Sequence, residues 1–233
     1  MQISKECVIV LAKAPVEGQV KTRLAADIGP KAASGLYRAF VADLLQMLGK
    51  TDYSIHVHFT PSDAELQMKK WLGSAYEFVP QAVGDLGARM AAAFKHGFSN
   101  HFSRVVLIGA DFPDLPASFI HEAFNALLIN EAVLGPSHDG GYYLIGFNRD
   151  GFLPGVFTDI AWGTEHVFSD TAQIFEVNNT SVHYLARWWD IDTYTDLMDF
   201  IQRQKNARSH VAAETTRFIN EVGLSHANTR DPL

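Results

Sequence analysis

Short apolar runs alternate with amphipathic segments along most of the chain. Residues 7–12 and 104–109 are almost entirely apolar and rich in β-branched side chains, which is typical of strands buried on both faces of a parallel sheet. Residues 30–49 instead carry apolar side chains every three or four positions, which predicts an amphipathic helix that Pro30 begins. Because strands and helices keep alternating up to residue 201, the pattern predicts a three-layer α/β/α sandwich with a mostly parallel central sheet.

The length and composition agree with one large α/β domain. The chain has 233 residues, of which 47% are hydrophobic and 19% are charged, and this is enough for one sizeable core. The sequence contains no stretch that is typical of a linker. We therefore expect one domain over residues 1–205, followed by a helical tail over residues 206–233 that packs on the same domain.

Charge and cysteine usage argue against several classes of protein. The formal net charge is −7, whereas a nucleic-acid binder needs a basic surface to neutralise phosphates. Cys7 is the only cysteine, which fits a reducing cytoplasm, and its place in an apolar run indicates a core residue. That first run is too short for a membrane span or a signal sequence. We expect a cytoplasmic monomer or homodimer that binds no nucleic acid.

A basic loop directly follows the first apolar run. Lys13, Lys21 and Arg23 lie within eleven residues and are separated by Pro15 and Gly18. Ligands bind at the carboxyl ends of strands in open α/β sheets, so this loop is placed to wrap a nucleotide diphosphate. The alternative is an exposed basic loop without a ligand. The spacing matches neither a P-loop nor a dinucleotide-binding glycine motif.

Two carboxylates follow the apolar run at residues 104–109. Asp111 comes just past the expected strand end, between Gly109 and Pro113, and Asp114 follows Pro113 directly. Magnesium keeps several waters and takes one or two protein carboxylates together with substrate phosphate. Asp111 alone could therefore hold the ion, whereas Asp114 is better explained as the cap of a helix or turn.

Asp139, Gly140 and Gly141 separate two further extended runs. Glycines let a backbone approach a ligand closely, so Asp139 could hold a metal, a ribose or an acceptor. An Asp-Gly pair between extended runs is equally a common hairpin turn. The residues by themselves leave both interpretations open.

Two more groups are candidates for binding a metal. Asp190 lies beside two tryptophans, has no evident capping role and could complete a metal site, whereas Asp192 could cap the helix that follows. His56 and His58 alternate on one expected strand and could share a face. Without a third ligand, such a pair more often packs or lies at the surface than binds zinc.

Six segments carry a recognisable set of motifs, although no single segment is specific. They are residues 12–24 (AKAPVEGQVKTRL), 84–90 (GDLGARM), 109–115 (GADFPDL), 134–146 (LGPSHDGGYYLIG), 161–164 (AWGT) and 190–193 (DIDT). In this order they resemble the DUF2064 family of bacterial glycosyltransferase-like proteins. That family belongs to the nucleotide-diphospho-sugar transferase superfamily, so the resemblance implies a GT-A fold that binds a nucleotide.

The resemblance also implies roles on the donor side. The basic loop would cover the base and phosphates of the donor. The implied nucleotide-binding residues are Ala12, Lys13, Ala14, Lys21, Arg23, Gly84, Arg89 and Gly109. Asp111 would bind Mg²⁺ or Mn²⁺, with Asp192 or Asp190 as the second ligand.

Further roles are implied on the acceptor side. The residues that would line it are Gly140, Gly141 and Trp162. The implied catalytic residues are Lys21, Arg23 and Asp139. The family is also similar to guanylyl- and cytidylyltransferases, whose N-terminal loop likewise carries Lys and Arg. This chain lacks their Ala-Gly-Gly-x-Gly-x-Arg form, which argues against simple nucleotidyl transfer.

We consider three functions, in order of preference. The first is a metal-dependent transferase that moves a sugar from a nucleotide-diphospho-sugar to a small-molecule acceptor, with Lys21 and Arg23 stabilising the leaving nucleotide. The second is a nucleotidyltransferase that condenses a nucleoside triphosphate with a phosphorylated acceptor. The third is a nucleotide-binding protein without catalysis, since a fold does not dictate a function.

Overall fold

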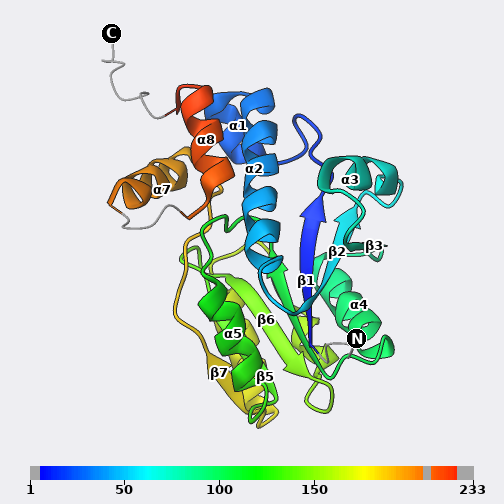
Figure 1. Cartoon of the computed structure of the whole chain (residues 1–233). Coiled ribbons are helices and arrows are strands. Elements are labelled where there is room, and N and C mark those ends of the chain that lie inside the picture. The colour runs from blue at the N-terminus through cyan, green and yellow to red at the C-terminus, as the bar shows by residue number, and fades with distance from the viewer. Residues whose placement is uncertain (1–5, 207–210, 225–233) are drawn as a thin grey trace. The chain divides into compact units, whose positions relative to one another are not determined.

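The computed structural model describes residues 6–206 and 211–224, which divide into two units. The sheet unit consists of residues 6–14, 47–109 and 115–190, and the helical unit consists of residues 15–46, 110–114, 191–206 and 211–224. The chain crosses from one unit to the other at residues 14, 46, 109, 114 and 190. Figure 1 labels most of the helices and strands of both units.

In the part of the chain that the structure describes, seven strands form the sheet of the sheet unit. They are β1 (Glu6–Lys13), β2 (Ser54–Thr60), β3 (Glu77–Pro80), β4 (Arg104–Gly109), β5 (Ala132–Pro136), β6 (Tyr142–Asn148) and β7 (Val182–Tyr184). Their order is β3-β2-β1-β4-β6-β5-β7. Only β6 runs antiparallel to its neighbours, β4 and β5, and the other pairs are parallel. The expected mostly parallel sheet is therefore confirmed.

Helices flank this sheet on both faces. Those of the sheet unit are α3 (Glu65–Leu72), α4 (Leu86–Ser99), α5 (Ala117–Ala126), the short 3₁₀ helix η1 (Pro154–Phe157) and α6 (Val167–Val177). Helix α4 packs on one face through an apolar cluster, and α5 lies against β4 and β5 on the other (Figure 1). The presence of helices on both faces confirms the three-layer α/β/α arrangement. Its physical reason is that both faces of a parallel sheet need apolar cover.

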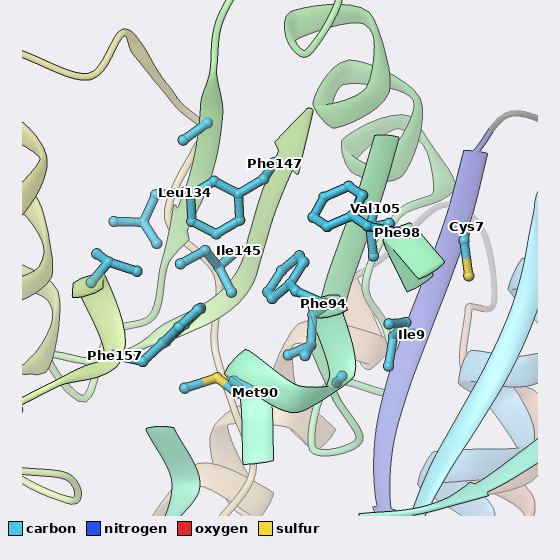
Figure 2. Close-up of a cluster of buried hydrophobic side chains, with 14 of the residues drawn as sticks. Cys7, Ile9, Met90, Phe94, Phe98, Val105, Leu134, Ile145, Phe147 and Phe157 are labelled. Carbon is cyan, nitrogen blue, oxygen red and sulfur yellow. The ribbon is translucent and has the colours of Figure 1, made fainter. Parts of the chain in front are cut away.

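One apolar cluster joins α4 to the sheet (Figure 2). Met90, Phe94 and Phe98 recur every four residues and therefore share one face of α4. Cys7 of β1 and Val105 of β4 point from the sheet into the same cluster. The prediction that Cys7 is a core residue is confirmed, and burial raises the pKa of its thiol well above the ordinary value.

The helical unit has an apolar core of its own. Its helices are α1 (Thr22–Ile28), residues 30–46 of α2 (Pro30–Leu48), α7 (Tyr194–Asn206) and α8 (Ala213–Glu221). Leu24, Phe40, Phe200 and Ile219 of these four helices are buried together. Residues 207–210 and 225–233 of the expected tail lie outside the described residues, and the division into a domain and a tail stays a prediction. Within the described ranges, no helix is both long and apolar enough to span a membrane.

Candidate functional site

Four charged side chains converge in the helical unit. The Lys21 Nζ atom lies 2.6 Å from a carboxylate oxygen of Asp111 and 3.6 Å from one of Asp192. The Arg23 guanidinium donates a hydrogen bond of 2.9 Å to the other oxygen of Asp192. We call these four residues the Lys–Asp cluster. It joins two of the predicted metal ligands to the two predicted catalytic cations.

The backbone and the core direct Lys21 into this cluster. Lys21 precedes α1 in a left-handed conformation with φ 48°, and its side chain is only 4% exposed. Its ammonium lies 5.8 Å from the centroid of the Phe40 ring, within range of a cation–π interaction. A buried ammonium loses most of its hydration, so it requires anionic partners. Asp111 and Asp192 supply them.

Helix α7 begins in a way that leaves the Asp192 carboxylate in the cluster. The Asp196 carboxylate accepts hydrogen bonds from the backbone N–H groups of Asp192 (3.1 Å) and Thr193 (2.7 Å). The Thr193 hydroxyl in return accepts one from the Asp196 N–H (3.3 Å), which completes a capping box. The interpretation of Asp192 as the helix cap is therefore wrong, and its side chain pairs with Lys21 and Arg23 instead.

Asp111 and Asp114 follow β4 but have different surroundings. The Asp111 carbonyl accepts a hydrogen bond from the Ile191 N–H at 3.2 Å, and its side chain is 43% exposed. Asp114 is buried, with a carboxylate oxygen 3.5 Å from the Gln204 amide and 3.7 Å from the Arg203 guanidinium of α7. Asp111 is therefore accessible to a ligand, whereas Asp114 ties residues 110–114 to α7.

Three of the recognisable segments meet in the sheet unit. A Cβ atom added to Gly87, at the start of α4, would lie 2.9 Å from the Trp162 ring. A Cβ atom on Gly140 would lie 2.2 Å from the carbonyl oxygen of Glu165. The Phe168 N–H also donates to the Gly140 carbonyl at 2.9 Å. Trp162 thus packs against the start of α4 and meets the Tyr142 ring at a centroid distance of 6.4 Å, whereas Gly140 packs against the backbone of Glu165.

The Asp139 side chain makes hydrogen bonds within the loop that contains it. Its carboxylate accepts hydrogen bonds from the Ser137 hydroxyl and from the Gly141 N–H, the latter at 2.9 Å. This is an Asx-type turn, and it joins β5 to the antiparallel strand β6. The hairpin interpretation of this segment is therefore correct. The residue is exposed, and its role toward an acceptor stays a prediction.

The other expected donor-side residues lie in the sheet unit. Those at the ends of β1 and β4 are Ala12, Lys13, Ala14 and Gly109. Gly84 and Arg89 flank the start of α4, and the Arg89 Nε atom donates to the Gly84 carbonyl at 3.0 Å. Asp190, the alternative metal ligand, is the last residue of this unit.

Gly140→Ala is expected to destabilise the fold by about 1–3 kcal/mol, because the left-handed backbone disfavours a side chain. The backbone φ at Gly140 is +90°, and the added methyl group would collide with the Glu165 backbone. Urea unfolding followed by circular dichroism measures the change. Gly155→Ala is the matched control, because a Cβ atom there meets nothing within 4 Å. Equal midpoints for the two variants would contradict the close packing of this turn.

Comparison with solved structures defines the class of fold. A cytidylyltransferase from Leptospira borgpetersenii has a TM-score of 0.55 and 13% identity, covering 99% of this chain and 100% of that one. Rv0371c from Mycobacterium tuberculosis H37Rv, solved in complex with manganese, has a TM-score of 0.51 and 16% identity, covering 84% of this chain and 98% of that one. These likenesses show that the chain shares its fold with these two proteins, one of which is a cytidylyltransferase.

The family follows from closer matches. Residues 43–164 match DUF2064, described as an uncharacterised protein conserved in bacteria. A Desulfovibrio desulfuricans G20 protein, described as a candidate nucleotide-diphospho-sugar transferase, is 38% identical with a TM-score of 0.88, covering 96% of this chain and 99% of that one. The chain therefore belongs to the DUF2064 family. A search of the curated proteins finds no match.

Proposed function

We propose that this protein is a metal-dependent transferase that uses a nucleotide-activated donor, in first place a nucleotide-diphospho-sugar. The observation that carries the proposal is the Lys–Asp cluster, in which two carboxylates share one cation beside an exposed arginine. The description of the D. desulfuricans relative as a candidate nucleotide-diphospho-sugar transferase supports the choice of donor.

The two carboxylates suit a hard divalent cation. The Lys21 ammonium lies close to the carboxylates of both Asp111 and Asp192, so a single cation can contact both carboxylates at once. Magnesium and manganese prefer such oxygens, and magnesium leaves its other positions to water and substrate phosphate. Asp111 and Asp192 would hold the ion, with Asp190 as the alternative to Asp192. When bound, Mg²⁺ or Mn²⁺ would neutralise charge on the donor diphosphate.

The cations of the cluster suit the phosphates of the donor. Two positive and two negative side chains cancel in the cluster itself, so a divalent ion would make it positive overall. Lys21 would then exchange its carboxylate partners for phosphate oxygens. Arg23 is 72% exposed, and its fork of N–H donors matches two phosphate oxygens at once. Both side chains would stabilise the nucleoside diphosphate as it leaves.

The acceptor would be handled by the loop residues of the sheet unit. We assign Gly140, Gly141 and Trp162 to its binding, and Asp139 to its activation. An acceptor oxygen would attack the anomeric carbon, the bond from that carbon to the diphosphate oxygen would break, and the acceptor proton would pass to the Asp139 carboxylate. The exposed position of Asp139 supports this assignment.

Nucleotidyl transfer is the second candidate, and the fold shared with a cytidylyltransferase favours it. The products distinguish the two reactions. Sugar transfer releases a nucleoside diphosphate from a nucleotide-sugar, whereas nucleotidyl transfer releases pyrophosphate from a nucleoside triphosphate. Binding of nucleotide without either product would support a non-catalytic protein.

A thermal-shift screen tests the binding step. A nucleoside diphosphate or nucleotide-sugar is expected to stabilise the protein by about 2.7 kcal/mol at a hundredfold excess over its Kd, and only when Mg²⁺ or Mn²⁺ is present. The same nucleotides with EDTA in place of the metal are the control. If no nucleotide raises Tm with metal present, the proposal loses its basis.

A further inference from the structure

Three histidines and a glutamate converge in the sheet unit, on residues that the proposed transferase function does not use. His56 and His58 lie on β2, Glu77 on β3 and His96 on α4. One ring nitrogen of each histidine lies within 4.8 Å of those of the other two. The two Glu77 oxygens lie 3.3 Å from Nε2 of His56 and 3.2 Å from Nε2 of His96. We call these residues the His–Glu cluster.

The topology explains why these side chains meet. Residues two apart on a strand share a face, so His56 and His58 point the same way. The parallel register of β2 and β3 places Glu77 directly beside His56. The His96 ring centroid then lies 5.8 Å from that of His56 and 5.3 Å from that of His58. The sequence pattern supplied no third ligand for the histidine pair, and α4 provides it.

The buried histidines have unsatisfied ring nitrogens. His58 is 3% exposed and His56 is 4% exposed. Nε2 of His58 and Nδ1 of His56 are buried and have no hydrogen-bond partner among the described residues. Such atoms are rare in folded proteins, because a buried polar atom without a partner costs free energy. A cation bound through Nε2 of His58 would satisfy that atom.

The histidines of β2 are held in the form that binds metal. Burial lowers the pKa of His58 to about 3, and burial likewise lowers the pKa of His56 below its ordinary value. Both rings are therefore neutral at physiological pH, and a neutral imidazole keeps the lone pair that a metal requires. His96 and Glu77 are 32% and 51% exposed, which gives an ion access from solvent.

We propose that His56, His58, His96 and Glu77 form a binding site for a transition-metal dication, with Zn²⁺ as the best match. Three imidazole nitrogens and one carboxylate oxygen are a suitable tetrahedral set for zinc, whereas magnesium and calcium prefer oxygen ligands alone. Zinc–nitrogen bonds of about 2.0–2.1 Å require ligand atoms about 3.4 Å apart, so small rotations of the side chains suffice. Four protein ligands make a closed site, which would hold β2, β3 and α4 together.

Zinc titration of the full-length, untagged protein tests this proposal. Competition with a chromogenic chelator is expected to show one equivalent of tightly bound Zn²⁺, unaffected by excess Mg²⁺. Co²⁺ is expected to give the intense visible absorption of a four-coordinate site. Zn²⁺ is also expected to raise Tm without any nucleotide, so this result is independent of the transferase proposal.

His96→Ala is the decisive variant, because residue 96 lies on a helix, is partly exposed and tolerates alanine. It is expected to weaken Zn²⁺ binding by at least about tenfold, since even outer partners of a metal site change affinity by about that factor. His183→Ala is the matched control: that imidazole pairs with Glu122 at 2.8 Å and is expected to leave binding unchanged. Absence of Zn²⁺ binding, or equal binding by His96→Ala and wild type, would overturn the proposal.

Discussion

Asp111→Asn is expected to reduce transfer by about 10²–10³-fold, the scale of losing one electrostatic contact to the transition state. Asparagine keeps the size of the side chain but removes the charge that would hold Mg²⁺ or Mn²⁺. The measurement is release of nucleoside diphosphate from a nucleotide-sugar with Mn²⁺ present. The rise in Tm caused by nucleotide and metal is expected to disappear in the same variant.

The folding of Asp111→Asn is expected to be nearly intact. Asp111 is 43% exposed, and Lys21 keeps Asp192 at 3.6 Å, so the buried ammonium retains one anionic partner. Asp27→Asn is the control: this exposed carboxylate lies on α1 of the same unit and is expected to leave turnover unchanged. Wild-type turnover by Asp111→Asn would exclude Asp111 as a metal ligand.

Phe94→Ala is expected to lower the free energy of unfolding by about 3–5 kcal/mol, the usual cost of truncating a buried phenylalanine. Phe94 has no exposed surface and lies at the centre of the cluster in Figure 2. Its ring meets that of Phe147 edge-on at 5.0 Å and stacks on that of Phe157 at 5.8 Å. The truncation removes these contacts and leaves a cavity between α4 and the sheet. Urea unfolding followed by circular dichroism measures the loss.

Val83→Ala controls for the effect of truncation as such. Val83 is 99% exposed, and a surface change of this kind is expected to alter stability by no more than about 0.5 kcal/mol. The free energy of unfolding of Phe94→Leu is expected to lie between those of Phe94→Ala and Val83→Ala, because leucine refills part of the cavity. If Phe94→Ala were as stable as Val83→Ala, the cluster would not be the core that holds α4 to the sheet.

Two hydrophobic patterns, short apolar runs and apolar residues at every third or fourth position, were enough to predict the sheet and its helices. The apolar run at residues 104–109 is β4, and the period of four that begins at Pro30 is α2. In both cases the spacing of apolar residues within the segment indicates which of its faces are buried, so the segment's own sequence predicts its secondary structure. The order of the strands and the reversal at β6 depend on pairing between segments, and no local pattern contains that information.

The residue types of the candidate site were predictable from the sequence, and the contacts between them were less so. Lys21, Arg23 and Asp111 stand out because they follow strand ends, where ligands bind in open sheets. Asp192 was ambiguous, since any Asp before a helix is a plausible cap. The structure resolved this through Asp196, which takes over the hydrogen bonds at the start of α7.

The sequence by itself therefore determined the elements, the apolar faces and the family motifs of this protein. Only the tertiary structure decided which charged side chains and which imidazole side chains lie close together. Arg23 and Asp192 are 169 positions apart, yet they form one hydrogen bond. His96 joins His56 and His58 only because α4 packs on the face of β2 that carries them. Such contacts depend on strand register and helix packing. These bring together residues that are far apart in the chain, and the local sequence around each residue does not predict its distant partner.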